Sequence, residues 1–547
     1  MKKFFLKISI CFAAFFAATI QSCTKYPNLM PTNDVTSETV YSTLAGYKSV
    51  LGKVYGAFAL TGNQGPAGNG DVQGIDEGFS DFYRIFWESE ELSTDEAVIS
   101  WGDVGIQDFH NMNWTANNSF LTGLYYRSMY QITLANEFIR QSADDELAKR
   151  GFTGTDADQI RQFAREARYL RAFQYWVMMD LYGNPPFADE NTAVGAAPPA
   201  RIARADLFTY IENELKAIEP NMPAPHTNEY GRADQAAVWA LLARLYLNAP
   251  VYLGISTTVP TDPQAVPYYT NAITYANKVI GAGYQLIPNY SWLMRADNDL
   301  NTSATGEFIF TINYDGIHTQ GYGGTTFLTH ACVGGGMPAK SFGIGGGWSG
   351  TRTTKNLPAL FPGYPSFNTI TDARAQFYTS GQNLEIADLT AFTDGLGVTK
   401  YKNIKRDGSP GSSQDFSDID MPLFRLPEMY FIYAEAVLRR GTGGDATTAL
   451  GYMNALRTRA YGGTSGNITS TDLTLSFILD ERARELYWEG FRRTDLIRYN
   501  QFVEGTYLWP WKGGVGTGTG VGSFRKLYPI PSREINSNTN LIQNPGY

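Results

Sequence analysis

Cysteine and histidine are scarce in this chain, and their scarcity excludes several classes of protein. The 547 residues include three cysteines and four histidines. Cys11 lies in the apolar N-terminal segment, Cys23 follows that segment, and Cys332 stands alone in the rest of the sequence. Cys332 would have no partner once Cys11 is removed with that segment and Cys23 is lipidated, so we expect no intramolecular disulfide. Four histidines without a CxxC or HExxH string also make a zinc site unexpected. Stability must come from a large hydrophobic core, which a chain of this length can bury.

Signatures of catalysis are also missing. The nearest approach to a GxSxG nucleophile elbow is Gly347-Trp348-Ser349-Gly350, which has the wrong order. The glycines at 343–347 do not stand between a clear strand and a helix, so a phosphate-binding loop is not expected. Carboxylates cluster at 88–96 (Glu88, Glu90, Glu91, Asp95 and Glu96), and a glycosidase needs two. Such clusters are mostly solvated surface, so the sequence favours a protein without enzymatic activity.

Positive charge is in deficit. The formal net charge is -9, and removing Lys2, Lys3 and Lys7 with the N-terminal segment would make it -12. Nucleic-acid binding depends on Lys and Arg that neutralise phosphates, so nucleic acid is not an expected partner. The chain is 43% hydrophobic and 18% charged, as folded globular proteins are.

The N-terminal residues have the features of a targeting segment. Lys2 and Lys3 precede an apolar run that is too short to span a bilayer, which predicts a signal peptide over 1–22. The string Ile20-Gln21-Ser22-Cys23 resembles a bacterial lipobox, in which the cysteine receives a lipid. We therefore expect a lipidated tether over 23–40, although Cys23 could instead be incidental to an ordinary signal peptide. No later segment is apolar enough to cross a membrane, so the lipid would be the membrane anchor.

The remaining chain, 41–547, is expected to be one mostly helical unit. Apolar residues recur at helical spacing in a series of stretches. They are 166–187, 207–218, 231–248, 269–280, 424–441, 446–460 and 475–498. Gly441 is the expected C′ glycine of the fifth stretch. Paired helices of this size are typical of tetratricopeptide-like units. The unit divides into an N-terminal helical part (41–285) and a part over 286–547 that begins with long loops and a few short strands, such as 308–312.

Two acidic patterns leave alternatives open. Glu481, Glu485 and Glu489 share one helix face among arginines, which fits either a row of metal or catalytic carboxylates or an ion-pair network between helices. The run that starts at Asp297 resembles a calcium loop but lacks the glycine and the final glutamate of an EF-hand. Together with the acidic patch that includes Asp420, it could hold one structural calcium ion.

Aromatic residues are abundant, with 34 Tyr, 32 Phe and 10 Trp. Trp101, Tyr322 and Trp348 lie beside glycines in polar loops, where few local neighbours can cover a ring. An exposed ring can lie against the apolar face of a pyranose while nearby polar groups bind its hydroxyls. The alternative is that these rings are tucked beneath their loops.

Long strings of the chain resemble the SusD/RagB family of outer-membrane lipoproteins. The strings are EARYLRAFQYWVMMDLYGNPPF (166–187), GRADQAAVWALLARLYLNA (231–249), MPLFRLPEMYFIYAEAVLRRG (421–441), ALGYMNALRTRA (449–460), ERARELYWEGFRRTDLIRYNQF (481–502) and LYPIPSREINSNTNLIQNPGY (527–547). The resemblance implies a mostly α fold, in which tetratricopeptide-like helix pairs support loops that hold the ligand. It also implies an anchor in the outer membrane, facing the cell exterior, and a SusC-like TonB-dependent transporter as partner.

Other strings are similar to the starch-binding founding member of that family. They are DEGFSDFYR (76–84), LSTDEAVISW (92–101), YGGTTFL (322–328) and TYLWPWKGG (506–514). This similarity implies that Trp101, Tyr322 and Trp348 form an arc for an α-glucan or maltooligosaccharide, with Asp76 and Arg84 contacting its hydroxyls. Val104 stands where the founding member has an asparagine, and Asp103 could replace that hydroxyl partner. The alternatives are the same scaffold with another glycan or a peptide as ligand and, outside this function, a glycoside hydrolase.

Overall fold

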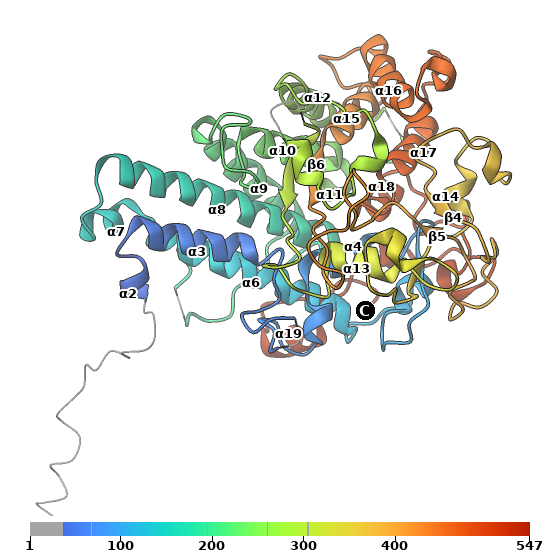
Figure 1. Cartoon of the computed structure of the whole chain (residues 1–547). Helices are drawn as coiled ribbons and strands as arrows, with labels where there is room; N and C mark the ends of the chain where they lie inside the picture. The colour runs from blue at the N-terminus through green and yellow to red at the C-terminus, as the bar shows by residue number, and fades with distance from the viewer. Residues whose placement is uncertain (1–36, 67, 194, 260, 303–305) are drawn as a thin grey trace, which may run out of the picture.

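The computed structural model describes residues 37–547 except 67, 194, 260 and 303–305 (Figure 1). The predicted signal peptide (1–22), Cys23 and most of the predicted tether (23–40) lie outside these residues. The last four residues of that tether form the short helix α2, Ser37–Val40. Within the described part of the chain, no helix is long and apolar enough to cross a membrane.

The described structure is mostly helical, as predicted. In chain order the α-helices are α2 (Ser37–Val40), α3 (Leu44–Gly56), α4 (Phe82–Glu91), α5 (Asp108–Asn111), α6 (Ser119–Gln141), α7 (Asp144–Lys149), α8 (Gly154–Leu181), α9 (Arg204–Ile218), α10 (Gln235–Leu247), α11 (Ala249–Leu253), α12 (Val266–Ile280), α13 (Gly324–Ala331), α14 (Asn356–Ala359), α15 (Leu426–Leu438), α16 (Ala446–Tyr461), α17 (Leu475–Leu486), α18 (Arg492–Arg498) and α19 (Ser532–Ser537). The strands are β1 (Val98–Ile99), β2 (Phe308–Ile312), β3 (Thr351–Arg352), β4 (Phe377–Tyr378), β5 (Gly397–Val398) and β6 (Met421–Arg425). Strand β2 has the bounds expected from the sequence.

Neighbouring helices pack in pairs. Helix α6 packs on α8, α10 on α12, and α15 on both α12 and α16. In Figure 1 the long helices α3, α6 and α8 form one end of the molecule, and α15–α17 lie at the other. One hydrophobic core includes residues from Tyr41 to Leu541, so the N-terminal and C-terminal parts share it. Cys332 is buried in this core.

Helix α15 ends differently from the expectation. The left-handed residue after it is Arg440, with φ of 71°, and not Gly441. The amides of Arg440 and Gly441 donate to the carbonyls of Val437 (3.0 Å) and Ala436 (2.8 Å), which closes a Schellman motif. A Cβ at position 441 would lie 2.8 Å from the backbone of Tyr269 in α12. Glycine is needed at 441 for this close approach between helices.

The predicted helix over 475–498 is two helices, α17 and α18. The break comes at Trp488, whose φ of 63° is left-handed, and at Gly490, with φ of 81°. The Trp488 indole donates to the Glu96 carbonyl at 3.1 Å, and the ring packs edge-on against Trp87. Tertiary contacts with α4 and the loop after it therefore override the helical periodicity of this stretch.

The carboxylate row on α17 and just after it belongs to a buried ion-pair network. Arg425 pairs with Glu485 at 2.7 Å and with Glu489 at 2.7 Å, and Arg374 pairs with Glu481 at 2.9 Å. Burial alone would raise the pKa values of Glu481 and Glu485, but the surrounding arginines outweigh it and lower both to about 2. The ion-pair alternative is confirmed, because these carboxylates are ionised and each has arginine partners.

Candidate functional site

The six side chains that the sequence predicts to bind glycan lie around one shallow surface hollow. The hollow has a volume of about 450 Å³. It is lined by Asp76, Gly78, Phe79, Arg84, Trp101, Asp103, Tyr322 and Trp348. Tertiary structure thus brings together residues from four separate segments of the chain.

The pairing of β1 with β3 positions the two tryptophans. Val98 pairs with Arg352 and Ile99 with Thr351 in an antiparallel ladder. Trp101 follows β1 and Trp348 precedes β3, so the ladder holds their loops side by side. The Trp101 indole nitrogen also donates to the Trp348 carbonyl oxygen at 3.0 Å. The position of one ring is therefore tied to the backbone of the other.

Asp81 attaches the Tyr322 loop to the start of α4. Its Oδ1 accepts from the Arg84 amide at 2.9 Å, which caps α4, and from the Gly324 amide at 2.8 Å, at the start of α13. A Cβ at Gly323 would lie 2.0 Å from the Asp81 Cβ, so the loop can approach this closely only with glycine at that position. Tyr322 is held at the edge of the hollow as a result.

The three rings form a curved apolar surface with Trp348 in the middle. The Trp101 and Trp348 centroids lie 6.4 Å apart with their planes at 44°. The Tyr322 and Trp348 centroids lie 6.1 Å apart with their planes at 65°. Because neighbouring planes are tilted, the rings cannot make one flat platform.

Both tryptophans are half-buried, so they fall between the two alternatives that the sequence left open: they are neither free of their neighbours nor covered by their loops. Trp348 stacks on His330 with centroids 4.7 Å apart and planes at 24°. Trp101 packs edge-on against Phe327 at 6.0 Å. A Cβ at Gly350 would lie 2.6 Å from the Trp101 ring. Glycine at this position therefore leaves room for the ring to pack against the backbone and does not make it more exposed. Each tryptophan is therefore supported by a neighbouring ring, while Tyr322 is 38% exposed.

Arg84 lies in the floor of the hollow and is only 3% exposed. Its guanidinium lies between the rings of Phe79 and Phe327, at 4.2 and 4.6 Å from their centroids. It donates to Glu88 at 3.1 Å and to the Tyr322 carbonyl at 3.1 Å, whereas its Nη2 has no hydrogen-bond partner in the described structure. Arg84 thus supports the aromatic wall from beneath and has little surface for direct ligand contact.

Asp76 and Asp103 lie at the rim and are exposed. Asp76 also accepts from the Gly78 amide at 2.9 Å, which caps the short 3₁₀ turn η2 (Glu77–Phe79). Val104, beside Asp103, is 92% exposed. Rim carboxylates of this kind can accept hydrogen bonds from ligand hydroxyls.

Sequence reasoning missed Phe79, which lines the hollow, and His330 and Phe327, which support its tryptophans. Phe79 lies within the string 76–84, so its nearness to Asp76 and Arg84 was the available signal. His330 lies on α13, a helix that was not predicted within the loop-rich part of the chain. No local pattern pairs its ring with Trp348.

The carboxylate cluster at 88–96 is not the solvated surface that was expected, because all five side chains are buried. Glu91 Oε1 accepts from the Gly490 amide at 2.6 Å, and Asp95 pairs with Arg492 at 2.7 Å. Burial raises the pKa of Glu88 to about 7 and that of Glu91 well above its ordinary value. The cluster ties α4 to the turn between α17 and α18.

The two predicted calcium residues line a different cavity, together with Asp299, Asp418 and other residues. The Asp297 carboxylate accepts from the Arg406 amide at 3.2 Å, and the Asp420 carboxylate accepts from the Tyr314 amide at 2.7 Å. Among the residues that the structure describes, no three carboxylate, imidazole or thiol groups converge to hold a metal ion. A calcium ion in this cavity, which would also need backbone or amide oxygens as ligands, stays a prediction.

The sequence comparisons point to one family. The SusD family model matches residues 368–547. The starch-binding protein SusD of Bacteroides thetaiotaomicron is 37% identical over 543 residues, covering 91% of this chain and 92% of that protein. SusD-like protein P2 of Formosa agariphila is 25% identical over 439 residues, covering 74% of this chain and 78% of that protein.

Solved structures share the fold. Surface glycan-binding protein A from Bacteroides thetaiotaomicron, in complex with laminarihexaose, has a TM-score of 0.67 at 20% identity, covering 91% of this chain and 99% of that chain. A SusD-like carbohydrate-binding protein from Bacteroides fragilis has a TM-score of 0.68 at 19% identity, covering 92% of this chain and all of that chain. At these identities the likeness concerns the fold alone.

Proposed function

This chain belongs to the SusD family, and we propose that it is a non-catalytic protein that binds starch-like α-glucans and maltooligosaccharides. Two findings support this ligand class. The relative that is 37% identical along nearly its whole length is a starch-binding protein, and the hollow carries aromatic rings with hydroxyl partners at its rim.

The observation that carries the proposal is the tilt between neighbouring rings. Successive planes at 44° and 65° suit a ligand that bends from one sugar to the next, as a helical α-glucan does. A flat, extended glucan would contact one ring face well and leave the others. Each stacked ring contributes on the order of 1 to 2 kcal/mol of binding free energy from buried apolar area.

The arrangement of carboxylates favours binding over hydrolysis. A glycosidase needs a protonated carboxyl and a second carboxylate on either side of the scissile bond. Glu88 has a suitable pKa of about 7 because of burial. However, it is fully buried and bonded to Arg84, so a sugar in the hollow cannot reach it. We expect no release of reducing sugar from starch.

We further propose that Cys23 carries a lipid that anchors the protein to the outer membrane, facing the cell exterior. There it would pass its glycan to a SusC-like TonB-dependent transporter. The lipobox-like string 20–23 and the family membership support this placement. Protease treatment of intact cells tests the exposed location, and co-purification with a transporter from the same cells tests the partnership.

Retention on insoluble starch tests the binding site. The double variant Trp101→Ala, Trp348→Ala should lose retention while its unfolding temperature stays close to that of the wild type. Tyr322→Phe, which keeps the ring and removes only the hydroxyl, is the control and should be retained. Maltoheptaose should compete in solution and laminarihexaose should not. Unchanged retention of the double variant would refute the site, and stronger competition by laminarihexaose would refute the α-glucan preference.

A further inference from the structure

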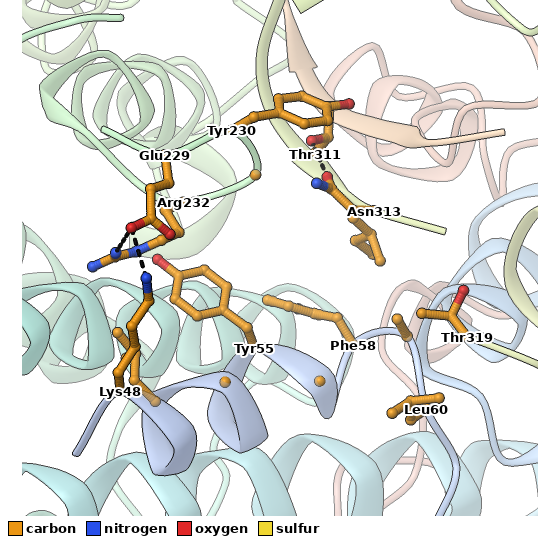
Figure 2. Close-up of a pocket in the computed structure, with 16 residues that line it drawn as sticks. Lys48, Tyr55, Phe58, Leu60, Glu229, Tyr230, Arg232, Thr311, Asn313 and Thr319 are labelled. Carbon is orange, nitrogen blue, oxygen red and sulfur yellow. Dashed lines mark hydrogen bonds and ion pairs between the residues drawn. The ribbon is translucent and has the colours of Figure 1, made fainter. Parts of the chain in front are cut away.

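A second cavity, separate from the hollow, lies between α3 and two segments that face it (Figure 2). Its volume is about 350 Å³, at the lower end of the range for small-molecule sites. Its floor is made by α3 and the turn after it, including Tyr55 and Phe58. The opposite wall is formed by the loop that contains Tyr230 and by the end of β2 with Asn313. The two sites share no lining residue.

Two glycines of α3 lie on the floor of this cavity and leave part of it without side chains. Gly52 and Gly56 lie one helical turn apart, and both line the cavity. A Cβ at Gly52 would meet nothing within 4 Å, and one at Gly56 would meet only Leu60 Cδ1 at 3.9 Å. Glycine is less favourable than alanine inside a helix, and packing within the described chain does not require it here. The floor of the cavity is therefore bare helix backbone at both positions.

The charged groups at the mouth of the cavity are paired with one another. Lys48 Nζ lies 2.8 Å from Glu229 Oε1, and Arg232 lies 3.4 Å from the same carboxylate oxygen. Arg232 also binds the buried Glu166, with its Nε at 2.9 Å from Glu166 Oε2. Two cations face two carboxylates, so the mouth has no excess charge to recruit an ionic ligand. It favours an uncharged one.

The polar groups of the cavity still have hydrogen-bonding capacity. Asn313 Oδ1 accepts from the Thr311 hydroxyl at 2.6 Å, while its Nδ2 makes no hydrogen bond within the described part of the chain. In Figure 2 this amide is directed toward the space between Tyr230 and Tyr55. The Lys48 and Glu229 side chains are about half exposed, with relative accessibilities of 53% and 58%. The hydrogen-bond donors Asn313 and Lys48 and the acceptor Glu229 thus border the apolar walls of the cavity.

We propose that this cavity is a second binding site for a short, uncharged oligosaccharide. A pyranose has apolar faces for the walls and a rim of hydroxyls for Asn313, Lys48 and Glu229. The proposal takes its ligand class from the function proposed above, but the site stands on its own geometry.

The two sites are close enough to act on one polymer. Thr319 lines the cavity and Tyr322 lines the hollow, so their Cα atoms are at most about 11 Å apart along three residues of chain. Two sites on one protein increase retention on a polymer beyond the affinity of either site. The cavity would therefore matter more for starch than for short oligosaccharides.

Calorimetric titration with maltotriose tests the proposal through stoichiometry. The wild type and Gly52→Ala should each bind two equivalents, because a methyl group leaves the cavity open. Gly52→Trp should bind one, since the indole enters free space and fills the cavity. The double variant Trp101→Ala, Trp348→Ala should still bind one equivalent of maltotriose, in the cavity. The triple variant, which also carries Gly52→Trp, should bind none. As a second probe that perturbs folding less, Asn313→Ala should weaken the cavity equivalent three- to tenfold.

The possible failures can be told apart. One equivalent in the wild type that is lost entirely in the double tryptophan variant overturns the second site and leaves the proposed function intact. If maltotriose does not bind at all, the α-glucan assignment fails, and the titrations are repeated with laminaritriose and cellotriose. If Gly52→Trp binds one equivalent of either sugar fewer than the wild type and Gly52→Ala does not, the result supports the cavity as a binding site. Equal stoichiometry in the two variants with every sugar overturns it.

Discussion

Adding one methyl group at Gly350 should weaken glycan binding, because it displaces the Trp101 ring. A Cβ there would lie 2.6 Å from two carbon atoms of that ring. Non-bonded carbons require about 3.5 Å, so the ring must move by roughly 0.9 Å in Gly350→Ala. The backbone at 350 is not left-handed, so alanine itself introduces no φ strain.

The size of the effect follows from the distance dependence of dispersion. A radial gap of about 0.5 to 1 Å forfeits a quarter to a half of the contact energy. For a ring that contributes about 2 kcal/mol, this is a loss of roughly 0.5 to 1 kcal/mol, or a two- to fivefold rise in Kd. Complete removal of the ring in Trp101→Ala should cost about 2 kcal/mol, or roughly thirtyfold.

Gly346→Ala is the matched control. It lies in the same loop, and its Cβ would meet nothing within 4 Å. Calorimetric titration with maltoheptaose should give wild-type affinity for Gly346→Ala and weaker affinity for Gly350→Ala. In a Trp101→Ala background, Gly350→Ala should have no further effect, since the displaced ring is absent. Equal affinities of the two glycine variants, or an undiminished effect in that background, would refute the reasoning.

Three further predictions concern the support beneath the hollow and the buried charges. His330→Ala should raise the Kd for maltoheptaose about two- to tenfold by removing the ring stacked on Trp348, whereas His330→Phe should largely preserve it; equal affinities would count against this support. Burial raises the pKa of Glu91 well above its ordinary value, so the protonated carboxyl is favoured in the folded chain; this contribution to stability is complete at low pH and is lost as the pH rises through the folded-state pKa. Glu91→Gln cannot ionise at this position, so its melting temperature should decline less than that of the wild type as the pH rises above the ordinary glutamate pKa of about 4.3; parallel curves would contradict this prediction. Arg425→Met should lower the free energy of unfolding in urea by about 3 to 5 kcal/mol, because it removes a shared cation from buried Glu485 and Glu489 and leaves them with Arg459 and Lys400. A loss below about 1 kcal/mol would be inconsistent with the network.

Much of the fold could be read from local patterns. The helical spacing over 207–218 and 231–248 gave α9 and α10 close to their observed bounds, because helix formation depends on neighbours three and four residues away. The same pattern failed at 475–498, where contacts with Glu96 and Trp87 turn the chain at Trp488. Periodicity carries no information about such distant partners.

The candidate site was accessible to sequence reasoning to a similar extent. Resemblance and glycine-flanked aromatics identified Trp101, Tyr322 and Trp348, which the structure brings to one hollow. The degree of burial was misjudged, because His330 and Phe327 come from a helix that the sequence did not reveal. Arg84 was taken as a ligand contact, whereas stacking between two phenylalanines places it in the floor.

By itself the sequence determined the helical class, the family resemblance and the residues that gather at the hollow, because these depend on strings of neighbouring residues. Only the tertiary structure decided which groups are buried and which are paired. The carboxylates at 88–96 have a surface-like composition but are enclosed by residues some 400 positions later. Gly52 and Gly56 look unremarkable in the sequence until the loop at Tyr230 closes a cavity over them. Burial and pairing arise between distant segments, so they are properties of the folded chain.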